Sequence, residues 1–263
     1  MNLGLQDRVA IVAGASRGLG RAIAAELCRE RARVVLVART EGPLRDAAEA
    51  IRRETGGHAH HVAADVSDEA DVERIIEETT NRWGKIDITV ANAGGPPAGS
   101  YETITPEQVR RAVEVNLMSA VLLAKAVTPF MKRQQWGRFI ALTSVSVKQP
   151  LPSLALSNTA RAGVVGFVKS MATDLAPHNV LCNCVAPGYM GTERVGDLFA
   201  EQAGREGREP RDVRAEIESR IPMGRLGRPE ELAALVAFLA SERASYITGA
   251  TIQTDGGFVQ GLL

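Results

Sequence analysis

Cysteine and excess charge are both scarce in this sequence, and each scarcity excludes a class of protein. The three cysteines, Cys28, Cys182 and Cys184, are too few for a disulfide framework, and the alternation of the last two in a strand pattern predicts that they simply pack. No residue spacing indicates a metal site. The 31 basic residues balance 31 acidic ones, so the sequence has no electrostatic footprint for nucleic acid or for a membrane surface.

Long hydrophobic runs are also missing. No apolar run approaches the roughly 20 residues that a membrane-spanning helix needs, and residues 1–8 lack the basic and then apolar layout of a signal peptide. The expected location is therefore the cytoplasm. What the chain does have is length and apolar content: 263 residues, 45% of them hydrophobic, are ample for the core of one soluble globular protein.

Strand and helix patterns alternate along the chain without a break in composition. Alternation with short connections indicates crossover units and a parallel sheet. The expected fold is a single doubly wound Rossmann-like α/β domain over residues 1–263, with seven parallel strands and helices on both faces. The segment 192–220 is polar and charged, which predicts a poor core former. The expected strands are 9–12, 33–38, 59–63, 86–91, 137–143, 180–186 and 250–254, and the expected helices are 44–54, 68–82 (capped by Ser67), 106–133, 160–175 and 229–240.

The first strand runs into a glycine-rich loop, which is the strongest local signal in the sequence. Gly14, Gly18 and Gly20 lie between the strand and an apolar-periodic helix pattern over 19–27. A strand that turns through glycines into a helix directs backbone N–H groups and a helix N-terminus toward an anion, and the missing Cβ atoms let a pyrophosphate approach. The spacing G-x-x-x-G-x-G taken alone fits an ordinary strand-to-helix connection equally well.

Further motifs follow the glycine loop in a fixed order. They are 13–20 (AGASRGLG), 65–66 (DV), 91–94 (ANAG), Asn116 within VEVNLMSA, 143–144 (TS), 187–189 (PGY) with Thr192, 221–225 (IPMGR) leading to 229–231 (PEE), 247–249 (ITG) and 255–257 (DGG). In this ordered set the sequence resembles the short-chain dehydrogenase/reductase family over essentially its whole length, and closely the branch of 3-oxoacyl-acyl-carrier-protein reductases. Ala13 stands where the family usually has Thr.

The resemblance implies a nicotinamide dinucleotide as cofactor. The glycine loop would bind its pyrophosphate, Asp65 would accept a hydrogen bond from the adenine amino group, and Thr192 would bond the nicotinamide carboxamide. Asn92 and Gly94 would flank the adenosine ribose and the nicotinamide side. Asp65 also fits a turn residue before a helix, and Thr192 a plain loop hydroxyl. The positions implied for cofactor binding are Gly14, Ser16, Arg17, Gly18, Leu19, Gly20, Arg39, Asp65, Val66, Asn92, Ala93, Gly94, Arg161, Pro187, Gly188 and Thr192.

The end of the second strand decides between the two nicotinamide cofactors. An acidic residue there binds the 2′-hydroxyl of NAD, whereas a cation accommodates the 2′-phosphate of NADP. The sequence has no Asp or Glu at this position; it has Arg39, and Arg17 in the glycine loop supplies a second guanidinium. We therefore predict NADP(H) in preference to NAD(H). The alternative is that both arginines are solvated surface residues.

The catalytic motif is where the sequence departs from the family. The family places Tyr-x-x-x-Lys about a dozen residues after a catalytic serine, which aligns with Ser144; Ser157 and Arg161 stand at the tyrosine and lysine positions. A phenol has a pKa of about 10 that a nearby cation lowers toward working pH, whereas an aliphatic hydroxyl is a far weaker acid. Arginine supplies positive charge but stays protonated. Asn116 would hold a helix bend and a water, as in the family, or is a plain polar helix residue.

Tyr189, Tyr101 and Lys148 are the candidate substitutes for the missing groups. Either tyrosine supplies a proton only if the fold brings its hydroxyl to a substrate oxygen beside Ser144, and packing against substrate or loop is the simpler interpretation of both. Lys148 is a cation at the substrate mouth or a solvated loop residue. The sequence therefore predicts that charge survives at the site while the usual proton path does not.

Two functions remain open. The first is an NADP(H)-dependent oxidoreductase that acts on the carbonyl/alcohol pair of a small-molecule substrate with an altered acid group, which the site hydroxyls and the segment 187–220 favour. The second is a catalytically impaired NADP(H)-binding pseudoenzyme that serves as a sensor or structural subunit. Halohydrin dehalogenases share the fold and use a Ser-Tyr-Arg set, but they lack the nucleotide site that the glycine loop indicates here. Either open function predicts little or no turnover of the family's usual ketones.

The resemblance also bears on assembly and on the segment near the site. Relatives are usually tetramers that pack the helices carrying Asn116 and Ala160 against neighbours, so we expect a homotetramer, and the run 160–168 suits such a contact. A buried face within one chain gives the same pattern. Residues 189–222 are expected to cover the substrate site as a mobile lid, because charges of both signs crowd this segment.

Overall fold

The computed structural model describes residues 2–262, and its centre is a parallel sheet. The strands are β1 (Val9–Ala13), β2 (Arg33–Ala38), β3 (His58–Ala63), β4 (Ile88–Ala91), β5 (Gly137–Leu142), β6 (Val180–Pro187) and β7 (Thr251–Thr254). They lie in the order β3-β2-β1-β4-β5-β6-β7. Every neighbouring pair is parallel. This confirms the expected fold class, a doubly wound Rossmann-like sheet of seven parallel strands.

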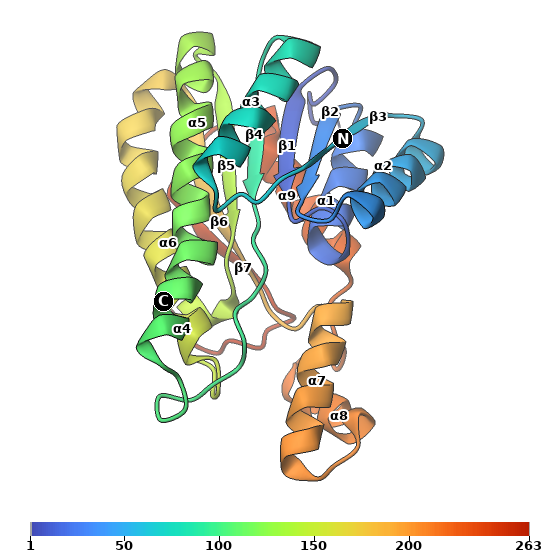
Figure 1. Ribbon diagram of the computed structural model, residues 1–263, viewed down its shortest axis with the longest axis vertical. Helices are drawn as coiled ribbons and strands as arrows, with labels where there is room; N and C mark the ends of the chain where they lie inside the picture. Colours follow the sequence, from blue (N-terminus) through green and yellow to red (C-terminus); the bar gives the residue numbers. More distant parts are fainter. Residues whose placement is uncertain (1, 263) are drawn as a thin grey trace.

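Helices cover both faces of this sheet (Figure 1). On one face lie α1 (Gly18–Arg29), α2 (Glu41–Thr55) and α9 (Pro229–Ala240). Their apolar residues, Ile23 and Val236 among them, form one buried cluster with alternate residues of the strands. The cluster arises because an amphipathic helix buries its apolar stripe against a sheet that is itself apolar on both sides.

The other face carries α3 (Glu69–Trp83), α5 (Ser119–Gln134) and α6 (Ala155–Leu175). Ile75 and Val127 are fully buried in the second large apolar cluster. With helices on both sides, every residue of β1 and β6 is buried. Cys182 and Cys184 lie in β6 as free, buried side chains, which confirms that they pack.

The helix expected over 106–133 is a single rod made of three parts. α4 (Pro106–Val113) runs through a π-helical turn (Glu114–Met118) into α5. Within residues 2–262, the rod is the helix that is long and apolar enough to cross a membrane by length and composition. Its buried residues, Leu123 and Val127 among them, instead pack into the sheet. One face of the rod therefore belongs to the core, and 33% of its most apolar stretch is buried.

Two helix starts differ from expectation. α6 begins at Ala155 rather than at 160. α3 is capped by Asp68 rather than Ser67: the Asp68 carboxylate accepts a hydrogen bond from a first-turn N–H at 3.0 Å, and Ser67 Oγ donates to Asp65 at 2.7 Å. The other expected elements agree with the structure to within three residues at each end. Helix ends depend on such local caps, which several neighbouring polar residues are equally able to supply.

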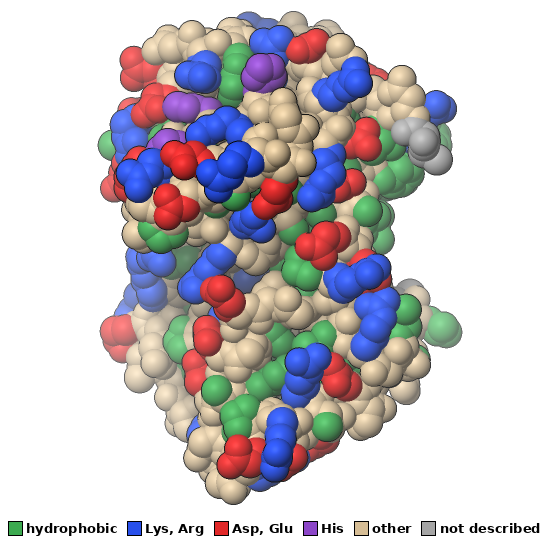
Figure 2. All heavy atoms as spheres, turned by 90° about the vertical axis from the view of Figure 1, so that its right-hand side faces the viewer, with side chains coloured by type: hydrophobic (Ala, Val, Ile, Leu, Met, Phe, Trp, Pro, Cys, Tyr) green, Lys and Arg blue, Asp and Glu red, His purple; other side chains and the backbone are tan. Residues whose placement is uncertain are grey.

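The polar segment expected to pack poorly is in fact two helices, α7 (Glu193–Glu206) and α8 (Pro210–Arg220), which hang from one edge of the sheet (Figure 1). We call residues 193–220 the α7–α8 hairpin. Phe199, Val213 and Ile217 are buried where the two helices meet. The prediction that this segment packs poorly was wrong, because a few well-spaced apolar residues are enough to form a buried contact between two helices. Charged residues are frequent on the remaining surface, and Figure 2 shows cations and anions interspersed among apolar and uncharged residues on the face that it draws.

Asp87 supports a stability prediction. This carboxylate is 2% exposed at the start of the fourth strand. It accepts from the Val9 N–H at 2.8 Å, and it pairs with Arg8 at 3.1 Å and Lys85 at 2.9 Å. Asp87→Ala leaves the buried Val9 N–H and the Lys85 cation without this partner, whereas Arg8 keeps its other ion pair, with Glu242 at 2.9 Å. We expect it to lower the free energy of unfolding by about 3 kcal/mol in urea titrations.

The control for this prediction is another aspartate. The Asp46 side chain is 71% exposed and lies 3.6 Å from Arg45, so Asp46→Ala is expected to change the free energy of unfolding by less than about 0.5 kcal/mol. Equal losses for the two variants would contradict the structural role of Asp87.

Candidate active site

One large cavity, about 1000 Å³, lies at the carboxyl edge of the sheet. The loops after β1, β4, β5 and β6 all line it, because the carboxyl ends of parallel strands meet at one edge. The strand order reverses between β1 and β4, and ligands of open α/β sheets bind at such a switch point. Residues far apart in the sequence, such as Gly14, Asn92, Ser144 and Gly188, thereby reach one cleft.

The glycine loop forms one wall of the cleft. Gly14 has a φ of 61°, and a Cβ there would lie 2.7 Å from Asn92 Nδ2. The Asn92 amide in turn donates to the Ala13 carbonyl at 3.1 Å and to the Gly14 carbonyl at 3.4 Å. Gly18 begins α1, so the N-terminal N–H groups of that helix lie at the cleft. This arrangement suits an anion, since a helix N-terminus carries unpaired N–H groups and partial positive charge.

Gly20 has a different position from the one that the sequence predicts. It does not line the cleft, and it is fully within the first turns of α1. A Cβ there would lie 2.2 Å from the Gly14 carbonyl oxygen. Gly20 therefore lets α1 pack closely on the glycine loop, and its effect on a ligand is indirect. The other positions implied for cofactor binding all line the cleft.

One end of the cleft, which we call the far end, is formed by the residues that follow β2 and β3, among them Arg39 and Asp65. Asp65 Oδ1 accepts from Ser67 Oγ at 2.7 Å and from the Ser67 N–H at 3.0 Å. Burial by itself would raise the pKa of Asp65, but these hydrogen bonds and the nearby Arg39 and Arg111 guanidiniums hold the pKa below its usual value. Asp65 is therefore an ionised acceptor at neutral pH. Arg39 is exposed and has no ion pair within residues 2–262.

The α7–α8 hairpin is tied to the rim of the cleft by two arginine contacts. Arg17 of the glycine loop pairs with Glu193 at 2.9 Å, with both side chains 72% exposed. Arg194 donates to the Pro96 carbonyl at 3.1 Å. Thr192 lines the cleft between these contacts, and its hydroxyl caps α7 by accepting from the Val195 N–H.

Sequence reasoning missed Arg194 and Arg111, which both line the cleft. The signal for Arg194 was its position two residues after Thr192, a candidate site residue. Arg111 lies on α4, and its charge reaches Asp65. Nothing in the local sequence distinguishes Arg111 from the many other arginines of this chain, because only the tertiary fold brings it to the cleft.

The opposite end of the cleft, which we call the near end, lies beside the loop after β5 and the start of α6. Ser144, Ser157 and Arg161 line it. Ser144 follows β5, and its Oγ accepts from the Ser146 N–H at 3.1 Å. Ser157 and Arg161 are one turn apart on α6, so they share a face of the helix. Arg161 Nη1 donates to the Leu142 carbonyl at 2.9 Å and to the Thr143 carbonyl at 3.0 Å. Burial lowers the pKa of the Arg161 guanidinium to about 10.

Asn116 lies in the π-helical turn and also lines the cleft. It is buried, and its Nδ2 donates to the Ala112 carbonyl at 3.1 Å. Its Oδ1 is buried without a partner among the described residues. A π turn at a cleft is common at functional positions because it redirects one side chain. Asn116 thus keeps an acceptor free at this end of the cleft.

None of the substitutes considered from sequence lines the cleft. Tyr101 is 88% exposed. Tyr189 packs edge-on against Phe258 with ring centroids 5.4 Å apart, and burial raises its pKa. Lys148 follows the loop after β5 but stays outside the lining. Among the described residues that line the cleft, there is no tyrosine, lysine, histidine or cysteine.

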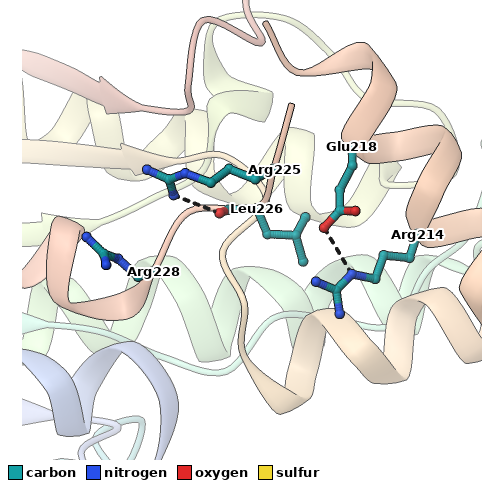
Figure 3. A pocket seen from close by; sticks show the side chains of 5 residues that line it. All are labelled: Arg214, Glu218, Arg225, Leu226 and Arg228. Carbon is teal, nitrogen blue, oxygen red and sulfur yellow. Dashed lines mark hydrogen bonds and ion pairs between the residues drawn. The ribbon is translucent and has the colours of Figure 1, made fainter. Parts of the chain in front are cut away.

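A smaller hollow of about 330 Å³ lies at the base of the hairpin (Figure 3). Arg214 and Glu218 of α8 face the returning chain there, where Arg225 and Arg228 lie. The arginines are already paired: Arg214 with Glu218 at 3.0 Å, and Arg225 with Glu231 at 2.7 Å. This hollow is therefore a structural joint between the hairpin and α9, and it is separate from the cleft.

Comparison with known proteins supports the fold and the ordered motifs. Residues 14–259 match a family model described as Enoyl-(Acyl carrier protein) reductase. The chain is 35% identical to the 3-oxoacyl-[acyl-carrier-protein] reductase FabG of Aquifex aeolicus (strain VF5), over 98% of this chain and 99% of that protein. It is also 35% identical to the FabG of Escherichia coli (strain K12), over 97% and 98% of the two chains.

Solved structures agree over the whole length. L-sorbose reductase from Gluconobacter frateurii, complexed with NADPH and L-sorbose, has a TM-score of 0.94 at 32% identity and covers 100% of both chains. YwfH, an NADPH-dependent reductase involved in bacilysin biosynthesis, has a TM-score of 0.92 at 29% identity, over 98% of this chain and 100% of that one.

The fold and the cleft define a doubly wound α/β protein of the Rossmann class. Within that class, the chain belongs to the short-chain dehydrogenase/reductase family, and among these oxidoreductases it resembles the 3-oxoacyl-acyl-carrier-protein reductases.

Proposed function

We propose that this chain is an NADP(H)-dependent oxidoreductase that acts on the carbonyl/alcohol pair of a small molecule through an atypical site. The observation that carries the cofactor choice is the end of β2. Arg39 lies there without an ion pair in residues 2–262, and Arg17 reaches the same cleft from the glycine loop. Two guanidiniums suit the charge and shape of a 2′-phosphate. The solved relatives with NADPH in their descriptions support the same cofactor.

The cleft fits a dinucleotide at several points. A Cβ on Gly94, which lines the cleft, would meet no atom within 4 Å, so this glycine leaves open space in front of its backbone. We assign the pyrophosphate to the N–H groups at the start of α1 and the adenine amino group to the ionised Asp65. Asn92, Pro187, Gly188 and Thr192 would surround the ribose and nicotinamide end, with Arg161 near the ribose.

Ser144 and Arg161, at the near end of the cleft, are the residues that would act on the substrate. NADPH, when bound, supplies a hydride. The Ser144 hydroxyl is free to donate, because its oxygen already accepts from the Ser146 N–H. Arg161 supplies a fixed positive charge that favours a developing negative charge on a substrate oxygen. The described lining residues offer no group that exchanges a proton readily near neutral pH, so the final proton would come from water.

The lack of a proton-exchanging side chain among the described lining residues also favours the second candidate function. A cleft without tyrosine, lysine, histidine or cysteine among its described lining residues fits an NADP(H)-binding pseudoenzyme, acting as a sensor or structural subunit. The two candidates differ in turnover and agree on the cofactor. Only the first predicts that some carbonyl compound is reduced at a rate that depends on Ser144.

Titration with both reduced cofactors tests the proposal. We expect NADPH to bind roughly 10- to 100-fold more tightly than NADH in fluorescence titrations, because charged hydrogen bonds to the 2′-phosphate contribute about 1.5–3 kcal/mol. Arg39→Gln should weaken NADPH and leave NADH unchanged. Arg45→Gln, which removes an exposed arginine of α2 outside the cleft, is the matched control. Equal or tighter binding of NADH would overturn the preference.

The remaining expectations stay predictions of the same proposal. We place the protein in the cytoplasm, as one domain, and assign the hairpin with its flanks (189–222) as the substrate lid. We also propose a homotetramer built on α5 and α6. Size-exclusion chromatography with light scattering checks the last point directly.

A further inference from the structure

One edge of the Arg161 guanidinium makes no hydrogen bond to the described residues. Its Nη1 is fixed by two backbone carbonyls. Its Nε and Nη2 make no hydrogen bond within the described residues, yet neither is enclosed by protein atoms. These two nitrogens form one edge of the planar guanidinium, with parallel N–H bonds. The side chain is therefore held in place from behind and presents a free donor edge to the cleft.

The charge on this edge is also uncompensated. Arg161 forms no ion pair within residues 2–262. The two carboxylates that line the cleft are occupied elsewhere: Asp65 accepts from Ser67 at the far end, and Glu193 pairs with Arg17 at the rim. A partly buried cation without a counterion favours binding of an anion, since that anion returns the lost solvation.

The surroundings of the edge admit a small planar group. Ser157, one turn before Arg161, has a short side chain with no hydrogen bond among the described residues, and it lines the cleft. A short side chain at this position leaves the approach to the guanidinium open. The Ser144 hydroxyl, at the same end, is a further donor. Guanidinium and hydroxyl donors together match the oxygens of a carboxylate.

We propose that the Nε–Nη2 edge of Arg161 binds a carboxylate of the substrate, so that the cleft selects oxo acids or hydroxy acids over neutral ketones and alcohols. The inference rests on the proposed function, because it names the substrate class of the same cleft. It makes Arg161 a specificity-determining residue. A competing use of the edge, hydrogen bonding to the ribose of the cofactor, is separated from it by the test.

The test compares acids with their uncharged amides. Butanoate, 3-phenylpropanoate and 4-oxopentanoate are each titrated against the matching amide by calorimetry, with and without saturating NADPH. We expect at least one acid to bind roughly 10- to 100-fold more tightly than its amide. Arg161→Gln should bring this ratio to about one, whereas Arg161→Lys should keep part of it as a point charge. Lys148→Gln, which removes a nearby cation outside the cleft, should leave the ratio unchanged.

Two serine variants keep the test decisive if Arg161→Gln does not fold. Ser157→Leu fills the approach to the guanidinium and should remove the acid preference, whereas Ser157→Ala should retain it. The inference is wrong if no pair is discriminated by the wild type, if discrimination survives in Arg161→Gln, or if the two serine variants discriminate equally. Loss of NADPH affinity in Arg161→Gln with an unchanged ratio would assign the edge to the ribose. Failure of the wild type to bind NADPH would instead contradict the proposed function.

Discussion

Changing Ser157 to Tyr and Arg161 to Lys together is expected to raise NADPH-dependent reduction of an acetoacetyl thioester by roughly 100- to 10,000-fold, the usual contribution of a positioned general acid. The wild type should turn this neutral ketone over slowly or not at all. The physical reason is the proton. The described lining residues include no phenol, imidazole, thiol or ammonium group, which are the groups that usually transfer a proton near neutral pH, and the phenol–ammonium pair restores one. The loss of reduced-nicotinamide absorbance measures the rate.

Two further variants show whether the proton is the cause. Ser157→Phe with Arg161→Lys fills the same volume without a hydroxyl, so it should stay as slow as the wild type. Its pH profile should also lack the ionisation that the tyrosine variant gains. Brisk turnover by the wild type would refute our account of the site. A double variant that stays inactive while still binding NADPH would mean that the substrate end of the cleft has changed as well.

Gly20→Ala is expected to abolish measurable nucleotide binding and to lower the free energy of unfolding by about 3 kcal/mol. A Cβ at this position would lie 2.2 Å from the Gly14 carbonyl oxygen, which is a backbone atom and cannot rotate away. α1 must therefore move off the glycine loop. That movement displaces the N–H groups at the start of the helix, which are the proposed pyrophosphate donors. Fluorescence titration and urea unfolding measure the two effects.

The matched control is a glycine in α6. A Cβ on Gly166 would meet no atom within 4 Å. Gly166→Ala should therefore be neutral or should raise the free energy of unfolding, by up to about 1 kcal/mol, because alanine is the better helix former. It should leave NADPH affinity unchanged. Normal NADPH binding by Gly20→Ala would show that the packing of α1 on the loop is not what positions the phosphate donors.

The sheet was predictable because most of its strands are short apolar runs, and because turn residues end or directly follow three of them: Gly14 after β1, Pro187 with Gly188 at the end of β6, and Asp255 after β7. Helix starts were less so. α6 begins at Ala155, ahead of the apolar run that marked it, because Asn158 Nδ2 donates to the Leu151 carbonyl at 3.1 Å and its Oδ1 accepts from the Leu151 N–H at 3.4 Å. These bonds to a preceding loop support the first turns, where Ser157, Asn158 and Thr159 have lower helix propensity than the alanine and leucine before them. Local pattern does not show such tertiary support.

The site was predictable to the extent that its residues stand at the ends of strands. Gly14, Asn92 and Ser144 follow β1, β4 and β5, so the topology itself brings them to one edge. Arg194 was missed because it reaches the cleft from a helix whose position depends on the packing of the hairpin. The two tyrosines illustrate the converse. Each was near the site by sequence, yet Tyr101 is exposed and Tyr189 packs among phenylalanines.

The contact between Arg17 and Glu193 links the proposed nucleotide site to the hairpin. The same guanidinium is the one that we assign to the 2′-phosphate, and the 2.9 Å ion pair joins it to the first turn of the hairpin. An arriving phosphate and the Glu193 carboxylate would compete for it, so the nucleotide would break this contact and leave the second one, between Arg194 and the Pro96 carbonyl, in place. Because both side chains of the ion pair are 72% exposed, its loss would cost at most about 1 kcal/mol. Binding of the nucleotide would therefore loosen the hairpin without detaching it.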